Sequence, residues 1–354
     1  GTIPQAPGSG EGWEIRPYWK LLDHVTSGQS SLIDDEQDGL DALETALRES
    51  IQLQSIADVP LGAFLSGGVD SSLIVALMQS QSNRPVKTFT IGFEEEGYNE
   101  AEFAKAVAEH LHTEHAELYL SANQTMDVIP GLPAIYDEPF ADSSKIPTFL
   151  VAQMARQHVT VALSGDAGDE LFGGYNRYFW GPRIWKKASL LSYGMRQKLS
   201  ALLISSSAAK GKRQQALSRL LPSKFQNALL KEKLQKLGHR LENVENIDEF
   251  YLSLVSEWQD PGEIVIGGKD PSVGLNNRVE CPELLDAENR MMFKDAMTYL
   301  PDDILCKVDR AAMAVSLETR VPFLDHRVVE LAWRLPLNMK IRDGQGKWAL
   351  RQIL

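Results

Sequence analysis

The sequence has only two cysteines, Cys281 and Cys306, among its 354 residues. So few cysteines exclude a disulfide framework and a four-cysteine zinc site, and they predict a protein of the reducing cytoplasm. Long hydrophobic runs are also missing, because the uncharged stretch 59–69 contains Gly and Pro and is too short to cross a bilayer. We therefore expect no membrane partner. The N-terminal residues show neither a basic segment nor an apolar one, so no secretory signal is visible.

Basic residues are the minority, with 36 Lys and Arg against 48 Asp and Glu, which gives a formal charge of −12. The stretch 183–240 departs from this balance, with fourteen Lys or Arg and one acidic residue, Glu232. A basic stretch can attract nucleic acid, and an RNA-modifying enzyme is the alternative that it motivates. Because no RNA-binding motif accompanies it, we interpret it as a solvated helical face and expect no nucleic-acid partner.

Short apolar segments alternate with helical ones in the first half of the chain. The expected strands are 61–65, 86–93, 115–120 and 159–163. Strands separated by helices predict an α/β fold with a parallel sheet covered on both faces. After about residue 180 we expect almost only helices. The chain is thus divided into a Gly- and Pro-rich linker (1–33), an α/β core (34–180) and a mainly helical part (181–354).

A glycine- and serine-rich loop follows the first of these strands. It reads Ser66, Gly67, Gly68, Val69, Asp70, Ser71 and Ser72. Two glycines let backbone N–H groups approach an anion, the serines add hydroxyl donors, and the next helix points its positive end there, which predicts a phosphate site. A Walker A loop would supply a lysine, whereas this loop has Asp70. A carboxylate beside phosphates requires a cation, so Asp70 is a candidate Mg²⁺ ligand.

A second loop, 164–175, follows the strand at 159–163 and carries Asp166, Asp169 and Glu170. Like charges this close repel unless a cation or hydrogen-bond donors offset them. We expect Asp169 to be the second Mg²⁺ ligand, beside Asp70 across adjacent strand ends. Asp166 and Glu170 would hold a substrate amine or relay a proton. The alternative is a solvated acidic turn at the start of a helix.

A third element, 299–310, begins with Pro301 and two aspartates, which predicts a helix start. Lys307 then lies one turn beyond Asp303. Taken alone, Lys307 is expected to be a surface charge or a partner in a salt bridge.

Five motifs in this order resemble the synthetase domain of the asparagine synthetase B family, which belongs to the ATP pyrophosphatase (PP-loop) superfamily. They are S-G-G-V-D-S-S (66–72), Y-D-E-P-F-A-D-S-S (136–144), S-G-D-A-G-D-E-L-F-G-G-Y (164–175), Y-L-P-D-D-I-L-C-K-V-D-R (299–310) and L-E-T-R-V-P-F-L-D (317–325). Near the end, Gly346, Lys347 and Trp348 resemble a further helix start of that family. The resemblance covers nearly the whole chain, from about Tyr18.

The resemblance implies a doubly wound, mostly parallel five-stranded sheet of the adenine nucleotide α-hydrolase type with a helical C-terminal extension. It also implies that ATP, with Mg²⁺, adenylates the β-carboxylate of aspartate and releases pyrophosphate, after which ammonia displaces AMP. Lys307 would lie over the α-phosphate. The residues expected to hold pyrophosphate or flank the nucleotide are Leu65, Ser66, Gly67, Gly68, Asp70, Ser71, Ser72, Ile91, Gly92, Ser164 and Gly165.

Two departures from the family pattern bear on this expectation. Asp166 stands where the better-known members have a glutamate, which leaves another carboxylate acceptor, such as a sugar uronate or a β-amino acid that cyclises to a lactam, as the alternative. The first residue, Gly1, is not the cysteine that begins the family's glutaminase domain. We therefore expect ammonia to come from a glutaminase domain missing from this chain, and a homodimer is compatible with the full-length form.

Overall fold

The computed structural model describes residues 2–5, 14–93, 101–208, 228–256, 265–268, 284 and 286–354. These residues fall into two compact units. The first holds the described residues as far as Gly174, together with Leu284 and Met292–Leu354; the second holds the other described residues between Tyr175 and Met291. All the site residues predicted from the sequence belong to the first unit.

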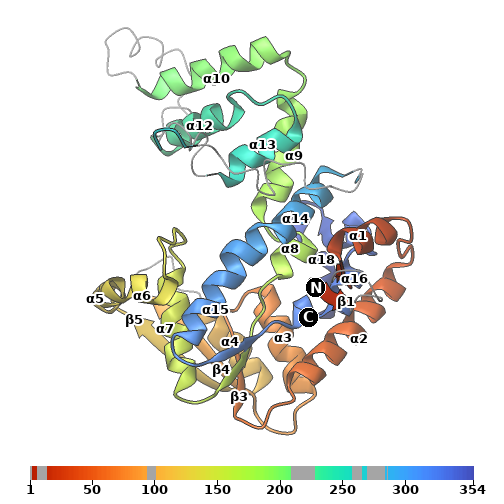
Figure 1. Cartoon of the computed structure of the whole chain (residues 1–354), viewed down its shortest axis with the longest axis vertical. Helices are drawn as coiled ribbons and strands as arrows, with labels where there is room; N and C mark the ends of the chain where they lie inside the picture. The colour runs from red at the N-terminus through yellow and green to blue at the C-terminus, as the bar shows by residue number, and fades with distance from the viewer. Residues whose placement is uncertain are drawn as a thin grey trace. The chain divides into compact units, whose positions relative to one another are not determined.

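A five-stranded parallel sheet forms the centre of the first unit (Figure 1). Its strands, in spatial order, are β5 (Glu114–Leu120), β4 (Lys87–Phe93), β3 (Leu61–Phe64), β6 (Val161–Leu163) and β7 (Glu318–Arg320). Every neighbouring pair is parallel, with Phe64 opposite Phe89 and Ala63 opposite Leu163. The predicted doubly wound α/β fold is confirmed.

Helices and two short antiparallel pairs complete the first unit. The pairs are β1 (Thr2–Gln5) with β2 (Glu14–Pro17) and β8 (Ile341–Arg342) with β9 (Gln345–Gly346). The helices are α1 (Leu21–Gln29), α2 (Glu36–Gln54), α3 (Val69–Ser80), α4 (Ala101–Leu111), α5 (Ala122–Val128), α6 (Leu132–Tyr136), α7 (Lys145–Arg156), α8 (Gly168–Phe172), α15 (Cys306–Met313), α16 (His326–Ala332), α17 (Leu337–Lys340) and α18 (Trp348–Ile353). Helical turns at Ile129–Gly131, Leu300–Leu305 and Pro322–Leu324 link some of them.

The order of the strands determines which face each helix covers. The chain moves outward from β3 to β4 and β5, then returns to the far side of β3 to form β6 and β7. Because such crossovers are right-handed, this reversal puts α3 and α4 on one face and α7 and α15 on the other (Figure 1). The loops after β3 and β6 therefore meet at the point where the strand order reverses, which is where open α/β sheets bind their ligands.

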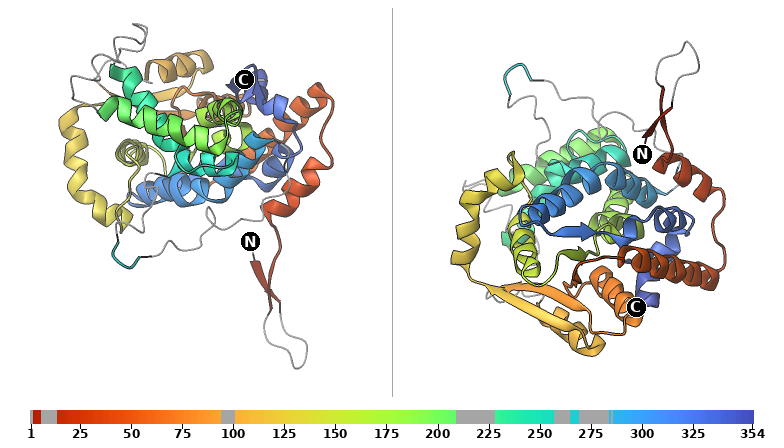
Figure 2. Two further views of the ribbon diagram at one scale, coloured as in Figure 1. Left: turned by 90° about the horizontal axis from the view of Figure 1, so that it is seen from above. Right: turned by 60° about the horizontal axis from the view of Figure 1, so that its bottom comes forward.

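Apolar spacing explains how the helices attach to this sheet. In α2, Leu43, Leu47 and Ile51 recur on one side and are all buried, while the Asp35 carboxylate caps the helix by accepting from the Asp38 N–H. Helices α16 and α18, from the end of the chain, lie beside α1 and α2, from its beginning (Figures 1 and 2).

Two elements of the first unit differ from the expectation. Strands do not stop near residue 180, because Glu318–Arg320 forms β7, the edge strand beside β6. A three-residue strand of two charged residues and a threonine has no apolar pattern to reveal it. Within residues 1–33, predicted as a linker, Leu21–Gln29 forms α1, and a methyl group at Gly28 would lie 2.8 Å from the Trp333 carbonyl oxygen.

The second unit is helical, as predicted for this part of the chain. Its helices are α9 (Asn176–Ala188), α10 (Tyr193–Ala208), α12 (Ala228–Leu241) and α13 (Ile247–Val255), and α14 (Ala287–Met297) contributes residues to both units. Ala188, Leu241, Val244 and Phe250 form its apolar core. The basic stretch belongs to this unit, and its residues 209–227 lie outside the described ones.

Candidate functional site

The loop after β3 has the tight geometry expected of an anion-binding turn. Gly67 adopts a left-handed backbone (φ +76°), and a methyl group there would lie 2.6 Å from the Ala104 nitrogen. The Ser71 hydroxyl accepts from the Ser66 N–H (3.1 Å) and lies 3.0 Å from the Ser66 hydroxyl. Glycine is therefore required for both the turn and the close approach of α4.

The loop after β6 lies directly against this first loop. A methyl group at Gly165 would lie 2.8 Å from the Ser71 nitrogen, and one at Gly168 would lie 2.5 Å from the Asp70 carboxyl carbon. Any larger residue at either glycine would push the loops apart. The structure thus brings the two predicted loops into contact.

Asp70 lies where the loops meet, and its side chain is 13% exposed. Burial raises the pKa of its carboxyl group to about 6; the positive charge of Lys347 acts in the opposite direction, and the negative charge of Asp169 adds to the rise. Its Oδ1 atom is buried and has no hydrogen-bond partner among the described residues. A buried carboxylate oxygen without a partner is costly, which indicates a place for a cation or a donor from a ligand.

Lys347 supplies the positive charge between the two predicted metal ligands. Its Nζ atom donates to Asp70 Oδ2 and lies 2.7 Å from Asp169 Oδ1. Desolvation opposes its charge, but the two carboxylates hold the pKa of Lys347 above its ordinary value. A methyl group at Gly174 would overlap the Lys347 side chain, so glycine leaves the space that this lysine fills.

Sequence reasoning does not place Lys347 among the site residues. The signal that could have found it is the segment Gly346-Lys347-Trp348, a family motif that carries no predicted role. Lys347 precedes α18 in a left-handed conformation (φ 59°), and its N–H donates to the Phe172 carbonyl of α8. This unusual backbone turns the side chain toward the loops from a segment distant in the sequence.

The second loop holds another carboxylate, Asp166, which is partly buried. The Ser164 hydroxyl donates to Asp166 Oδ2 at 2.5 Å. Burial raises the pKa of Asp166, whereas the Ser164 hydrogen bond and the charge of Lys307 lower it. Ala167, next in the chain, adopts a left-handed backbone (φ 70°), and Glu170 is buried in α8. The alternative of a solvated acidic turn is therefore wrong for Glu170, which is buried.

Lys307 is buried rather than exposed on the surface. Its Nζ atom donates to Asp142 Oδ2 (2.5 Å) and to the Ser144 hydroxyl (2.7 Å). Both partners belong to the 136–144 motif, which carries no role in the sequence prediction. The alternative of a salt-bridge partner is thus confirmed, with a partner distant in the sequence.

The remaining predicted residues line the ends of strands. Leu65 is buried after β3 and its N–H donates to the Phe89 carbonyl of β4. Ile91 and Gly92 lie further along β4, toward its carboxyl end. These positions flank the first loop, but no hydrogen bond joins Ile91 or Gly92 to that loop among the described residues.

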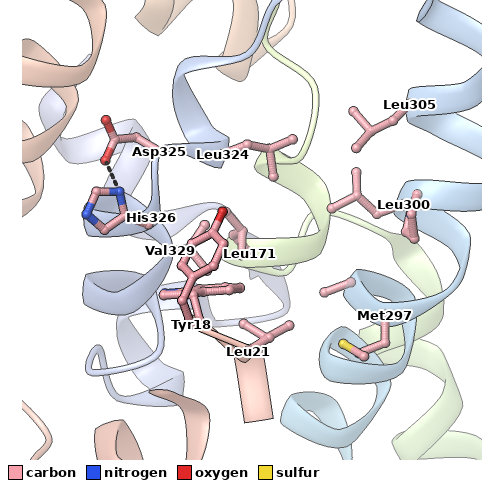
Figure 3. A pocket seen from close by; sticks show the side chains of 13 residues that line it. Tyr18, Leu21, Leu171, Met297, Leu300, Leu305, Leu324, Asp325, His326 and Val329 are labelled. Carbon is pink, nitrogen blue, oxygen red and sulfur yellow. Dashed lines mark ion pairs between the residues drawn. The ribbon is translucent and has the colours of Figure 1, made fainter. Parts of the chain in front are cut away.

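A separate cavity of about 720 Å³ lies elsewhere in the first unit (Figure 3). Its lining is mostly apolar and includes Leu171, Leu300 and Leu305, with His326 Nδ1 3.6 Å from Asp325 Oδ1. It contains none of the residues predicted for the site. We therefore assign the site by its chemistry to the two loops and not to this cavity.

The arrangement suits a charged phosphate ligand together with a metal ion. Among the described residues no group of three or more His, Cys, Asp or Glu side chains is placed to hold a metal ion by itself. Mg²⁺, however, usually takes one or two carboxylates and completes its shell with substrate phosphates and water. The Asp70 and Asp169 oxygens, one of them without a partner, fit that requirement.

No helix in the described part of the chain is long and apolar enough to cross a membrane.

Comparison with known proteins places this geometry in a family. The chain is 33% identical over 315 residues to asparagine synthetase [glutamine-hydrolyzing] 1 of Bacillus subtilis (strain 168), covering 87% of this chain and 45% of that protein. It is 40% identical over 174 residues to putative asparagine synthetase [glutamine-hydrolyzing] 2 of Methanocaldococcus jannaschii, covering 48% and 32%. Asparagine synthetase B of Escherichia coli (strain K12) is 29% identical over 196 residues, covering 49% and 34%.

The chain therefore spans less than half the length of these relatives. The sequence profile named asparagine synthase matches residues 42–354, which include both loops and both lysines. On these grounds the chain belongs to the asparagine synthase family.

Proposed function

We propose that this chain is a carbon–nitrogen ligase that adenylates the β-carboxylate of aspartate and transfers ammonia to give asparagine. In the first step a carboxylate oxygen bonds to the α-phosphorus of ATP, and pyrophosphate leaves. In the second step ammonia bonds to the acyl carbon, AMP leaves and the nitrogen loses a proton. The observation that carries the proposal is the pair of largely buried lysines, Lys347 beside Asp70 and Asp169 and Lys307 beside Asp142.

The first loop would hold the leaving pyrophosphate. Its backbone N–H groups and the hydroxyls of Ser66, Ser71 and Ser72 are donors, and the Ser72 hydroxyl is buried without a partner among the described residues. Leu65, Ile91, Gly92, Ser164 and Gly165 would flank the nucleotide. The N-terminus of α3, which has twelve residues, adds its dipole to the same side.

Positive charge would be the main contribution of the site to the first step. Negative charge grows on pyrophosphate as it departs, and preorganised cations stabilise that charge. Lys347 would act beside Asp70 and Asp169, and Lys307 would act over the α-phosphate. Mg²⁺, when bound by Asp70 and Asp169, would neutralise phosphate charge.

The second step would use the carboxylates of the second loop. Ser164 holds Asp166 in one orientation, so Asp166 can accept a proton from the attacking ammonia. Glu170 is buried next to Asp169 in the chain and would assist by holding the amine. The names of the three relatives describe them as glutamine-hydrolyzing, and hydrolysis of the glutamine amide releases ammonia. We propose that a region outside this chain supplies it.

Aspartate is the acceptor that the comparisons favour. Each of the three relatives is called an asparagine synthetase, which supports aspartate over a uronate or a β-amino acid. Asp166 is one methylene shorter than the glutamate of better-known members, and its hydrogen bond to Ser164 gives it a defined position without that methylene. No feature of the described residues favours another acceptor.

The test is to mix the chain with ATP, Mg²⁺, aspartate and ammonium and to measure pyrophosphate, AMP and asparagine. We expect all three in equal amounts, and ADP as product would contradict the proposal. Galacturonate in place of aspartate is the acceptor control and should give no pyrophosphate. Lys307→Ala should bind ATP normally and fail to release pyrophosphate.

A further inference from the structure

We infer that Asp142 and Ser144 are positioning residues that hold the Lys307 ammonium toward the reacting phosphate. This inference rests on the proposed function, because it assigns Lys307 its role there. It assigns a role to two residues of the 136–144 segment. Among the described residues, neither of them forms a hydrogen bond with the two phosphate-site loops.

Among the described residues, the hydrogen bonds of Lys307 use two of its three N–H groups and leave one for a ligand. An ammonium has three donors, and Lys307 gives one to Asp142 Oδ2 and one to the Ser144 hydroxyl. The other carboxylate oxygen, Asp142 Oδ1, accepts from both the N–H (2.7 Å) and the hydroxyl (2.8 Å) of Ser144. Each polar group of this cluster is thus used to hold another in place.

Other contacts also join the 136–144 segment to α15, the helix that carries Lys307. Tyr136, at the start of the segment, is buried and donates to the Lys307 carbonyl (3.5 Å), and its ring stacks on Phe140 with 5.1 Å between centroids. At the same end of the segment, Arg310 of α15 pairs with Asp137 (3.0 Å). The segment therefore contacts α15 at residues other than the Asp142–Lys307 pair as well.

A neighbouring carboxyl group, Asp303, forms no ion pair with Lys307 among the described residues. Asp303 precedes Lys307 by one turn, in the π-helical turn Leu300–Leu305, and its Oδ1 is buried without a partner among the described residues. Burial and the nearby Asp142 raise the pKa of Asp303, while Lys307 lowers it. The carboxylate that pairs with Lys307 is Asp142, whose Oδ2 lies 2.5 Å from the lysine Nζ. Wide π turns of this kind often mark functional sites.

The test compares kcat and KM for pyrophosphate release by the full chain, with ammonia as nitrogen donor. Asp142→Asn should lower kcat by about 10- to 100-fold, which is somewhat less than the effect of removing a transition-state donor altogether. The KM for ATP should change little. Asp137→Asn is the matched control, since it removes an exposed ion pair to the same helix, and it should keep normal kcat. Ser144→Ala should lower kcat, and Ser144→Thr, which retains the hydroxyl, should restore it.

A double-mutant cycle separates positioning from a general structural effect. In Lys307→Met, the further change Asp142→Asn should alter the residual rate by less than about twofold, because the residue acts only through the lysine. An equal loss in both backgrounds, or a normal kcat in Asp142→Asn, overturns the inference. If Asp142→Asn does not fold, equal rates for Ser144→Ala and Ser144→Thr overturn it instead. A wild-type chain that releases no pyrophosphate overturns the proposed function itself.

Discussion

The Lys347 ammonium donates to Asp70, a residue 277 positions earlier in the chain, and lies 2.7 Å from Asp169. One side chain thereby joins the loop after β3, the loop after β6 and the start of α18. Two carboxylates that the sequence predicts as metal ligands are already held together by a cation of the protein. This triad is central to the stability of the site and, in our proposal, to its chemistry.

Replacing Lys347 by Met should lower both stability and activity. The side chains of Lys347 and Asp70 are only 14% and 13% exposed, and breaking a buried pair by removing one partner costs about 3–5 kcal/mol. Pyrophosphate release should fall by about 100-fold or more, as for other transition-state donors. Urea unfolding and pyrophosphate release measure the two effects. Gln352→Met, on the exposed side of the same helix, should change neither.

Mg²⁺ should stabilise Lys347→Met more than the wild-type chain. In the variant Asp70 and Asp169 lack their lysine, so a bound divalent ion restores the positive charge between them. The measurement is the midpoint of thermal unfolding with and without Mg²⁺, in the absence of ATP. An equal shift in both proteins would argue against Asp70 and Asp169 as Mg²⁺ ligands.

Gly168→Ala should disrupt the site because of its position against Asp70. The added methyl group would lie 2.5 Å from the carboxyl carbon, so the Asp70 carboxylate must be displaced. Displacement of reacting groups by about 1 Å costs about 100-fold in rate, and we expect a loss of that size in pyrophosphate release. Gly131→Ala is the control, since nothing lies within 4 Å of its added methyl group. Full activity in Gly168→Ala would refute the contact.

His115 should make the free energy of unfolding depend on pH in the mildly acidic range. Burial lowers the pKa of His115 below its ordinary value of 6.5; the charge of Glu117 opposes the shift and that of Lys105 adds to it. As the pH falls, His115 therefore takes up a proton in the unfolded chain before it does so in the folded one. Its contribution to the free energy of unfolding is complete above about pH 6.5 and is lost as the pH falls toward the folded pKa.

The check for this pH dependence is unfolding by urea between pH 5 and 8, comparing the wild-type chain with His115→Gln. In the folded chain His115 Nδ1 lies 2.8 Å from the buried Thr88 hydroxyl, a contact that glutamine can partly replace. The variant should show a shallower dependence of stability on pH. His110→Gln, at an exposed position of α4, should keep the wild-type slope, and a wild-type slope in His115→Gln would contradict the assignment.

Leu317→Ala should destabilise the fold by about 2–5 kcal/mol, because it leaves a cavity where β7 joins the core. Leu317 is fully buried and packs with Phe89 and Ala312 between the sheet and α15. Chemical denaturation gives the change in the free energy of unfolding. Met313→Ala, at a side chain that is 57% exposed, should cost much less. Similar losses for both would mean that β7 is not part of the core.

The two loops could be predicted from the sequence because their signals are local. A strand, a glycine turn and a helix start lie within a dozen residues of Leu61, and the acidic loop after β6 follows the same pattern. Parallel strands imply that such loops share one edge of the sheet. Local pattern and sheet topology together are therefore enough to place Asp70, Asp166 and Asp169 near one another.

Lys307 shows where local reasoning reaches its limit. Helical spacing would pair it with Asp303, four residues earlier. The π-helical turn and the approach of the 136–144 segment give it Asp142 instead. Which of two carboxylates holds a buried ammonium depends on burial and on neighbouring charges, and neither is visible in a helical repeat.

By itself the sequence determined the fold class, the phosphate loop and the acidic loop, since propensity, periodicity and turn chemistry act over a few residues. Only the tertiary structure decided that Glu318–Arg320 is a strand of the sheet, that Lys347 pairs with Asp70 and that Asp142 pairs with Lys307. The physical reason is that buried charges are stable only beside opposite charges. Their partners here come from segments that meet after the chain has folded.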